Sequence, residues 1–95
     1  MSMTVRDNAG ASRYEALDES AAVAGFVEFV DHRGHRVLVH TEVDDAFEGQ
    51  GVGSTLAREA LDRALATGLD VVVSCPFITA WIEKHREYAD RVSLR

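Results

Sequence analysis

The feature that most constrains the fold is a run of alternating glycines, residues 48–55 (EGQGVGST), between a β-branched segment and an amphipathic one. Glycine tolerates positive φ and has no Cβ, so the backbone can turn tightly here and lie close to a ligand. A helix that begins at Val52 leaves its first N–H groups without intrahelical partners, and these groups, together with the helix dipole, favour phosphate. The spacing therefore predicts a strand–loop–helix unit with a cradle for a diphosphate.

The residues before this loop predict an antiparallel meander of short strands. Strand-like patterns cover residues 4–8, 13–17, 22–30 and 37–43. The Asn-Ala-Gly sequence at 8–10 predicts a turn after the first strand. The glycine-containing segment 31–35 predicts a hairpin that joins the third strand to the fourth.

Beyond the loop the hydrophobic period changes to that of a helix. Apolar residues recur at spacings of three and four across Val52–Ala66. Gly68 then predicts a left-handed C-terminal cap, residues 69–73 a short buried strand, and Pro76 the start of a second helix. Residues 85–92 form a last irregular or helical piece. The expected fold class is α+β (mixed α/β): an antiparallel meander followed by a helix, a buried strand and a C-terminal helix.

Size and charge limit the kind of protein. A chain of 95 residues predicts a single domain, residues 1–95. Ten basic and sixteen acidic side chains give a net charge of −6, which argues against nucleic-acid and membrane partners. One cysteine permits no intrachain disulfide, and no apolar run approaches the ~20 residues of a membrane span. We therefore expect a cytoplasmic protein that is a monomer or a weak homodimer.

Known phosphate-binding loops can be compared with the glycine run directly. The Rossmann fingerprint G-x-G-x-x-G fails at Ser54, and too few βαβ units remain for that fold. A P-loop needs a lysine, and this loop has none. The third interpretation is a cradle of the acyl-CoA type, in which the preceding strand and the first helical turn hold a pantetheine arm and a diphosphate. A plain glycine-rich turn is the alternative without a ligand.

Residues 47–56 (FEGQGVGSTL) resemble motif A of the GNAT superfamily of N-acetyltransferases, usually written R/Q-x-x-G-x-G/A. Four other segments resemble a subgroup of very small GNAT proteins, the YjdJ type: 40–43 (HTEV), 75–78 (CPFI), 81–82 (WI) and 85–88 (HREY). The resemblance extends over most of the chain, roughly residues 22–92. The conjunction of these segments is more specific than motif A alone.

The resemblance implies a GNAT-like domain that binds acetyl-CoA or CoA. It assigns the diphosphate to the backbone amides of Gln50, Gly51, Val52, Gly53 and Ser54. It also implies that the strand near Glu42 and Val43 pairs with the pantetheine amides in a β-like manner. The first motif position, usually Arg or Gln, is Glu48 here, and a carboxylate that pointed inward would repel the diphosphate. Because the main contacts are backbone N–H groups, we expect Glu48 to turn outward.

Cys75 is a candidate catalytic residue, because it ends the predicted buried strand just before a helix. A helix N-terminus stabilises a thiolate, so Cys75 could be an acyl-carrying nucleophile. The alternative is a small buried apolar residue, which free cysteine commonly is. Direct transfer from thioester to amine needs no enzyme nucleophile, only a bound thioester, an aimed amine and a route for the amine proton.

Two pairs of residues are candidates for that proton route. His40 and Glu42 lie two apart on one strand and share a face, which could carry a general base. Tyr88 and His85 lie three apart and could be neighbours on a helix, where either could line the site or protonate a leaving thiolate. The alternatives are a solvent-exposed polar face for the first pair, and a partly buried tyrosine with a surface histidine for the second.

No metal site is expected, since the four histidines and the single cysteine match no structural zinc spacing. The function expected from the resemblance is transfer of an acetyl group from acetyl-CoA to an unidentified primary amine, on a small molecule or a protein. The alternatives are a non-catalytic CoA-binding module for regulation or interaction, and a purely structural small domain.

Overall fold

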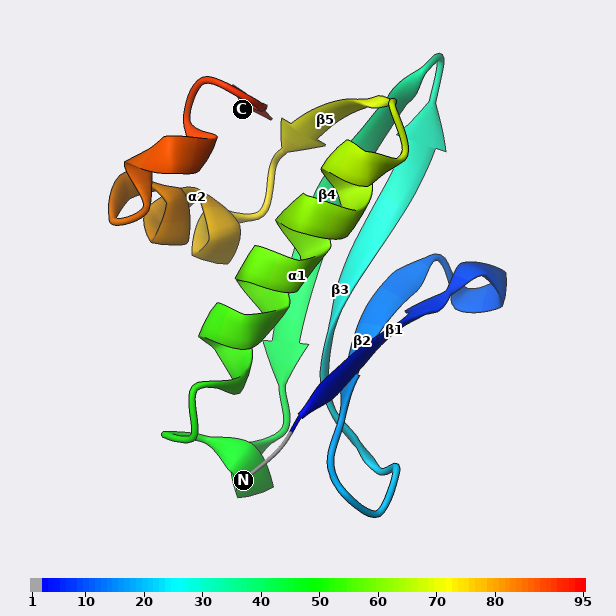
Figure 1. Ribbon diagram of the computed structural model, residues 1–95, viewed down its shortest axis with the longest axis vertical. Helices are drawn as coiled ribbons and strands as arrows, with labels where there is room; N and C mark the ends of the chain where they lie inside the picture. The colour runs from blue at the N-terminus through cyan, green and yellow to red at the C-terminus, as the bar shows by residue number, and fades with distance from the viewer. Residues whose placement is uncertain (1–2) are drawn as a thin grey trace.

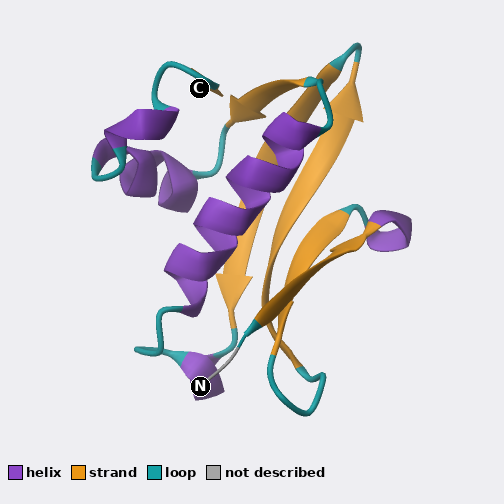
Figure 2. Ribbon diagram, in the orientation of Figure 1, coloured by secondary structure: helices purple, strands orange, loops and turns teal. Residues whose placement is uncertain are grey.

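A computed structural model describes residues 3–95 and places their six strands in one sheet of order β1-β2-β3-β4-β5-β6. The strands are β1 (Thr4–Asn8), β2 (Arg13–Leu17), β3 (Val23–His32), β4 (His35–Val43), β5 (Asp70–Val73) and β6 (Ser93–Leu94). The α-helices are α1 (Val52–Ala66) and α2 (Pro76–Glu83), and short 3-10 turns are η1 (Ala9–Ala11), η2 (Asp45–Phe47) and η3 (Arg86–Tyr88). The expected α+β fold is confirmed, and Figures 1 and 2 show α1 crossing the sheet with α2 beside it.

The sheet is antiparallel in its first part and parallel in its second. Strands β1 to β4 form the predicted meander, and β5 and β6 each add in parallel. Each parallel addition follows a helix, because a chain must cross over before it can run in the same direction again. Among residues 3–95, neither helix combines the length and the apolar character needed to cross a bilayer.

The hairpin between β3 and β4 is tighter than the predicted loop 31–35. Only Arg33 and Gly34 remain outside the strands, with φ of 49° and 81°. Two positive φ values are those of the turn that matches the twist of a two-residue hairpin. The guanidinium of Arg36 also binds both carboxylate oxygens of Asp31 at 2.7 Å, which holds the strand ends together.

The remaining boundaries lie within one residue of the predicted ones, apart from β6, which was not predicted. Strand β3 begins at Val23 rather than 22, and β5 begins at Asp70 rather than 69. Gly68 has the left-handed φ of 81° expected after the helix, and Pro76 begins α2 as predicted. Strand β6 has only two residues, and it exists because Val72 and Val73 of β5 pair with it.

The core lies between α1 and the sheet. The buried face of the helix consists of Val52, Leu56, Ala57, Ala60, Leu61 and Ala64. It packs on inward-facing residues of the central strands such as Val27 and Leu38, both fully buried. The small alanines let the helix approach the sheet closely, so its N-terminus is fixed beside the end of β4.

A glycine on β3 sets how closely that end of the sheet packs. A Cβ added at Gly25 would lie 2.6 Å from the carbonyl oxygen of Glu42 and 3.0 Å from a methyl of Leu56. Only a residue without a side chain fits between the β4 backbone and α1 at this point. Gly25 therefore helps to place the last residues of β4 against the beginning of α1.

One carboxylate is buried on β2. Glu15 is 1% exposed, and it accepts hydrogen bonds from Arg6, Asn8 and Arg13 at 2.9, 3.2 and 2.6 Å. Burial by itself raises the pKa of Glu15, but the hydrogen bonds from Arg6, Arg13 and Asn8 outweigh burial and hold this pKa below its usual value. The group is therefore ionised and fully paired at neutral pH.

Candidate functional site

The glycine loop joins β4 to α1 through two left-handed residues. Gly49 and Gly51 both have φ of 79°, and Gly51 is the N-cap of α1. No side chain among residues 3–95 caps this helix, and its first intrahelical bond runs from the N–H of Thr55 to the carbonyl of Gly51. The amides that precede Thr55 in the first turn are therefore free to bind an anion, as predicted. The predicted contribution of the Gln50 amide is wrong, because this N–H donates to the carbonyl of Phe47 at 3.3 Å.

Glycine is required at position 53 for a different reason than at positions 49 and 51. Its φ is not left-handed, but a Cβ there would lie 2.6 Å from Cζ of Phe77. The ring of Phe77, on α2, rests on the first turn of α1 although it is 44% exposed. The close approach at Gly53 is thus made by a ring of the protein itself, a contact that the sequence did not reveal.

Strands β4 and β5 pair over only four residues. His35–Leu38 pair with Asp70–Val73, after which the N–H groups of Ser74 and Cys75 both donate to the carbonyl of Leu38, at 3.0 and 3.1 Å. A bulge follows at once on β4, because Glu28 opposes His40 while Phe29 opposes Leu38. Within residues 3–95, the segment 39–43 therefore has no strand partner on its β5 side, and an unpaired strand edge can pair with an extended ligand.

The side chains of this unpaired segment divide between two faces. Thr41 lies toward α2, where its Oγ1 is 3.2 Å from Sγ of Cys75, a residue only 2% exposed. His40 and Glu42 lie on the other face, with Nε2 of His40 3.5 Å from Oε1 of Glu42. The structure thus brings His40 and Glu42 together as predicted, and it places Cys75 on the opposite side of the strand.

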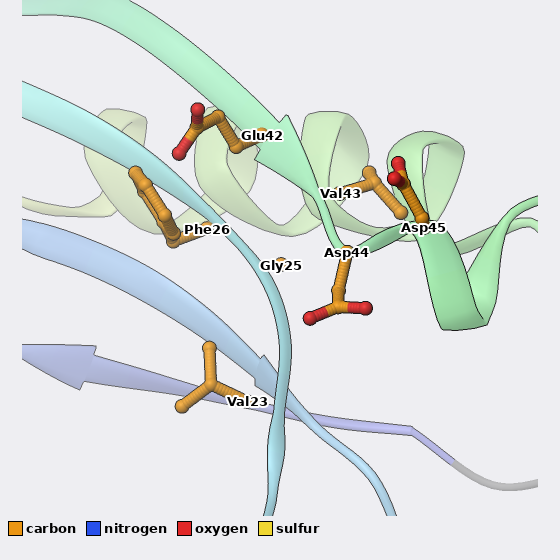
Figure 3. A pocket seen from close by; sticks show the side chains of 7 residues that line it. All are labelled: Val23, Gly25, Phe26, Glu42, Val43, Asp44 and Asp45. Atoms are coloured by element: carbon orange, nitrogen blue, oxygen red, sulfur yellow. The ribbon is translucent and has the colours of Figure 1, made fainter.

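A hollow of about 370 Å³ adjoins Glu42 (Figure 3). It is lined by Val23, Gly25, Phe26, Glu42, Val43, Asp44 and Asp45. Figure 3 shows Phe26 and Glu42 side by side on neighbouring strands, with Asp44 at the end of β4. Phe26, Asp44 and Asp45 were not among the predicted site residues. The acidic turn at 44–45 was visible in the sequence, but its place in this hollow depends on the β3–β4 register, which sets Glu42 opposite Phe26.

Tyr88 and His85 gather around Trp81 at the side of α1. The buried hydroxyl of Tyr88 donates to Asp62 at 2.7 Å and accepts from Arg58 at 3.3 Å. Burial raises the pKa of Tyr88, and Asp62 raises it further while Arg58 opposes the shift. The ring of His85 stacks on Trp81 at 3.7 Å, and its Nδ1 lies 2.8 Å from the Trp81 carbonyl oxygen.

Trp81 connects this cluster to the glycine loop. Its indole N–H donates to Oγ of Ser54, in the first turn of α1, at 2.9 Å. The resemblance assigned the amide of Ser54 to the cradle, but it gave no sign of this contact with Trp81. The only available signal was that Phe77 and Trp81, four apart, share one face of α2.

The sequence profile of the GCN5-related N-acetyl-transferase family matches residues 13–91. The chain belongs to this family. The family profile and the structural similarity below confirm the resemblance found in the sequence at the level of the superfamily and of the fold.

Individual relatives agree with this assignment. Protein NATD1 of Bos taurus is 33% identical over 66 residues, which are 65% of this chain and 58% of that protein. The chain thus matches little more than half the length of this relative. A GCN5-like candidate N-acetyltransferase from Staphylococcus aureus superposes with a TM-score of 0.69 over 97% of this chain and 89% of that one, at 22% identity. A GNAT-family acetyltransferase from Staphylococcus aureus Mu50 gives a TM-score of 0.56 over 88% and 54%, at 11% identity.

Proposed function

We propose that this chain binds acetyl-CoA at the glycine loop and transfers the acetyl group to a primary amine. The proposal rests on two neighbouring backbone segments with free hydrogen-bonding groups. These are the first turn of α1 and the edge of the β4 segment 39–43 that faces β5. An anion receptor directly beside a free strand edge suits a ligand that has a diphosphate joined to an extended amide chain. Membership in the GCN5-related family supports the same ligand.

We assign each part of the ligand to a segment of this arrangement. The diphosphate would be bound by the amides of Gly51, Val52, Gly53 and Ser54, without that of Gln50, whose N–H already donates to the carbonyl of Phe47. The pantetheine amides would pair with the β4 backbone near Glu42 and Val43. These residues fit the group, because Gly49 and Gly51 hold the loop open without side chains, and in the described part of the chain no atom beyond their sequence neighbours lies within 4 Å of a Cβ built at either one. The bound thioester supplies an electrophilic acyl carbon.

We place the acyl group where β4 and β5 separate, beside Thr41 and Cys75. Cys75 is buried and its Sγ is 3.2 Å from a hydroxyl, so we assign it to the wall of this region rather than to nucleophilic attack. The acceptor amine would approach from the face that carries His40 and Glu42, and these two would take its proton directly or through a water. Tyr88 is a weaker candidate for the acid that protonates the leaving CoA thiolate, because its hydroxyl already donates to Asp62.

The alternative is a CoA-binding module with no catalysis. The engagement of Tyr88 by Asp62 favours this alternative, since it removes one of the predicted proton donors from the acyl site. Turnover with any amine would separate the two functions. For either one we propose a cytoplasmic protein, monomeric or weakly dimeric, in keeping with its one cysteine and its net charge of −6.

The test is calorimetric titration of CoA and acetyl-CoA into the protein and into Gly51→Asp. The substitution adds bulk and negative charge where the phosphate would lie, so binding should be lost. The matched control is Gly34→Asp, because Gly34 has nearly the same φ (81°) in the β3–β4 hairpin, at the opposite end of β4. Release of free CoA thiol in the presence of a panel of amines then reports transfer. No binding to the parent protein at millimolar CoA would overturn the proposal.

A further inference from the structure

Trp81 is held in one orientation by three neighbours. The ring of His85 stacks on the indole at 3.7 Å with an interplanar angle of 10°, and the ring of Tyr88 lies 5.5 Å away. The guanidinium carbon of Arg58 lies 5.2 Å from the indole centroid. Trp81 is only 7% exposed, so the indole N–H has little freedom, and it donates to Oγ of Ser54 at 2.9 Å.

This contact determines what Ser54 can do. A serine hydroxyl has one proton and two lone pairs, so an oxygen that accepts from Trp81 keeps its own proton available for another acceptor. Ser54 is exposed and is the third residue of α1, where the backbone N–H groups also lack intrahelical partners. The Ser54 proton is therefore available on the same helical turn as the free amides.

The neighbouring contact of α2 acts on the same turn. Phe77 packs on Gly53, and Trp81, four residues later, binds Ser54. Two aromatic residues of one helix face thus contact two consecutive residues of the first turn of α1. This arrangement fixes the position of the first turn of α1 before any ligand arrives, which lowers the cost of ordering it on binding.

We propose that Trp81 is a positioning residue that directs the Ser54 hydroxyl toward the diphosphate. The proposal rests on the proposed function and adds a donor to the diphosphate site that acts through the Ser54 side chain. When a phosphate oxygen accepts the Ser54 proton, Oγ becomes a better acceptor, because hydrogen bonds in a chain polarise one another. The bond from the indole N–H therefore strengthens when the site is occupied.

The experiment follows the indole N–H resonance by NMR. The chain has one tryptophan, so this resonance is unambiguous. The probes are CoA, 3′-dephospho-CoA and pantetheine, of which the first two carry the diphosphate. We expect the indole resonance to move downfield with both diphosphate ligands and not with pantetheine. In Ser54→Ala the shift should disappear although the amides of residues 51–53 still respond to CoA.

A double-mutant cycle on CoA affinity gives a second readout. Trp81→Phe keeps an aromatic ring but removes the N–H, and it should weaken CoA binding about three- to tenfold, the value of one hydrogen bond. In the Ser54→Ala background the same substitution should have no further effect, whereas a general packing role would weaken binding in both backgrounds.

The outcomes separate this proposal from the proposed function. If CoA moves the amides of residues 51–54 but leaves the indole resonance unchanged, the role of Trp81 is overturned while the CoA site stands. If no amide of the loop responds to CoA, both are overturned. Because the indole measurement uses the unmodified protein, it remains decisive even if a variant at position 81 fails to fold.

Discussion

The hydroxyl of Thr41 and the thiol of Cys75 lie 3.2 Å apart at the point where β4 and β5 cease to pair. Thr41 is on the unpaired part of β4, and Cys75 is the N-cap residue of α2. The contact therefore closes the inner end of the region where we place the acyl group. It also joins two segments that the sequence separates by 34 positions.

Cys75→Ala tests whether this thiol is a wall or a nucleophile. As a wall, its loss removes one sulfur atom and one hydrogen bond, so the free energy of unfolding should fall by about 1–2 kcal/mol. CoA binding and acetyl transfer should both persist. The measurements are urea unfolding, calorimetry with CoA, and intact mass of the parent protein after incubation with acetyl-CoA. An acetylated Cys75, together with loss of transfer in the variant, would show that it is a nucleophile.

Glu48→Gln should strengthen CoA binding. Glu48 follows η2 in extended conformation and is exposed, at the motif position where the family usually has Arg or Gln. Removing an exposed charge near a diphosphate is worth at most about 1 kcal/mol, so we expect a gain in affinity of about two- to fivefold. The control is Glu83→Gln, an exposed acidic residue at the end of α2. The charge acts at a distance, so the gain should remain with the carboxylate turned outward; equal affinities for parent and Glu48→Gln would mean that solvent and salt screen it completely.

Gly53→Ala should be disruptive because of Phe77 rather than because of backbone strain. The new Cβ would lie 2.6 Å from Cζ of the ring, so the ring must swing outward into solvent. We expect a loss of about 1–2 kcal/mol in unfolding free energy, within the range for overpacking. Phe77→Ala removes the obstacle, so adding Gly53→Ala to it should cost clearly less. Additive losses in urea unfolding would show that the contact does not determine the residue at 53.

Local sequence patterns predicted most helices and strands. The strand segments that they missed are defined by pairing between distant parts of the chain. The bounds of α1 follow from its apolar spacing and those of β2 from alternation, because both signals lie within the element itself. Strand β6 has two residues and no such signal, and it is defined by its parallel pairing with Val72 and Val73. Residues 31–32 and 35 fall in the predicted loop 31–35, because polar and charged side chains hide the strand pattern there.

The candidate site shows the same division. The need for glycine at 49 and 51 was predictable, since their left-handed φ belongs to a local strand-to-helix turn. The shared face of His40 and Glu42 was also predictable from alternation. The position of Cys75 on the opposite face of β4 was not predictable, because it depends on where β5 ends beside β4.

Gly25→Ala should lower the free energy of unfolding more than an ordinary glycine substitution does. The added Cβ would lie 2.6 Å from the Glu42 carbonyl oxygen, and backbone cannot move aside as a side chain can. We expect a loss of about 3 kcal/mol in unfolding free energy. The matched control is Gly10→Ala, where the nearest atom is 3.8 Å away, and it should change stability by less than about 0.5 kcal/mol. Similar urea midpoints for the two variants would contradict the close approach of β3 to β4.

Glu15→Gln should lower the free energy of unfolding at neutral pH and make that free energy less dependent on pH. The pKa of Glu15 is lower in the folded protein than in the unfolded chain, so its ionised form contributes stability above the unfolded value of about 4.3. That contribution is lost as the pH falls through the lower folded pKa. We expect the variant to be about 2 kcal/mol less stable at pH 7, the scale of a hydrogen bond to a charged group.

The difference between parent and Glu15→Gln should therefore shrink as the pH falls below about 4. Urea unfolding at several pH values measures it, with Glu83→Gln as the control, because Glu83 is exposed. A constant difference between parent and Glu15→Gln from pH 7 to pH 3 would show that the packing of the side chain, rather than its charge, holds Arg6 and Arg13 in place. If instead the gap closes, the ionised carboxylate organises this end of β1 and β2 through its contacts with both arginines.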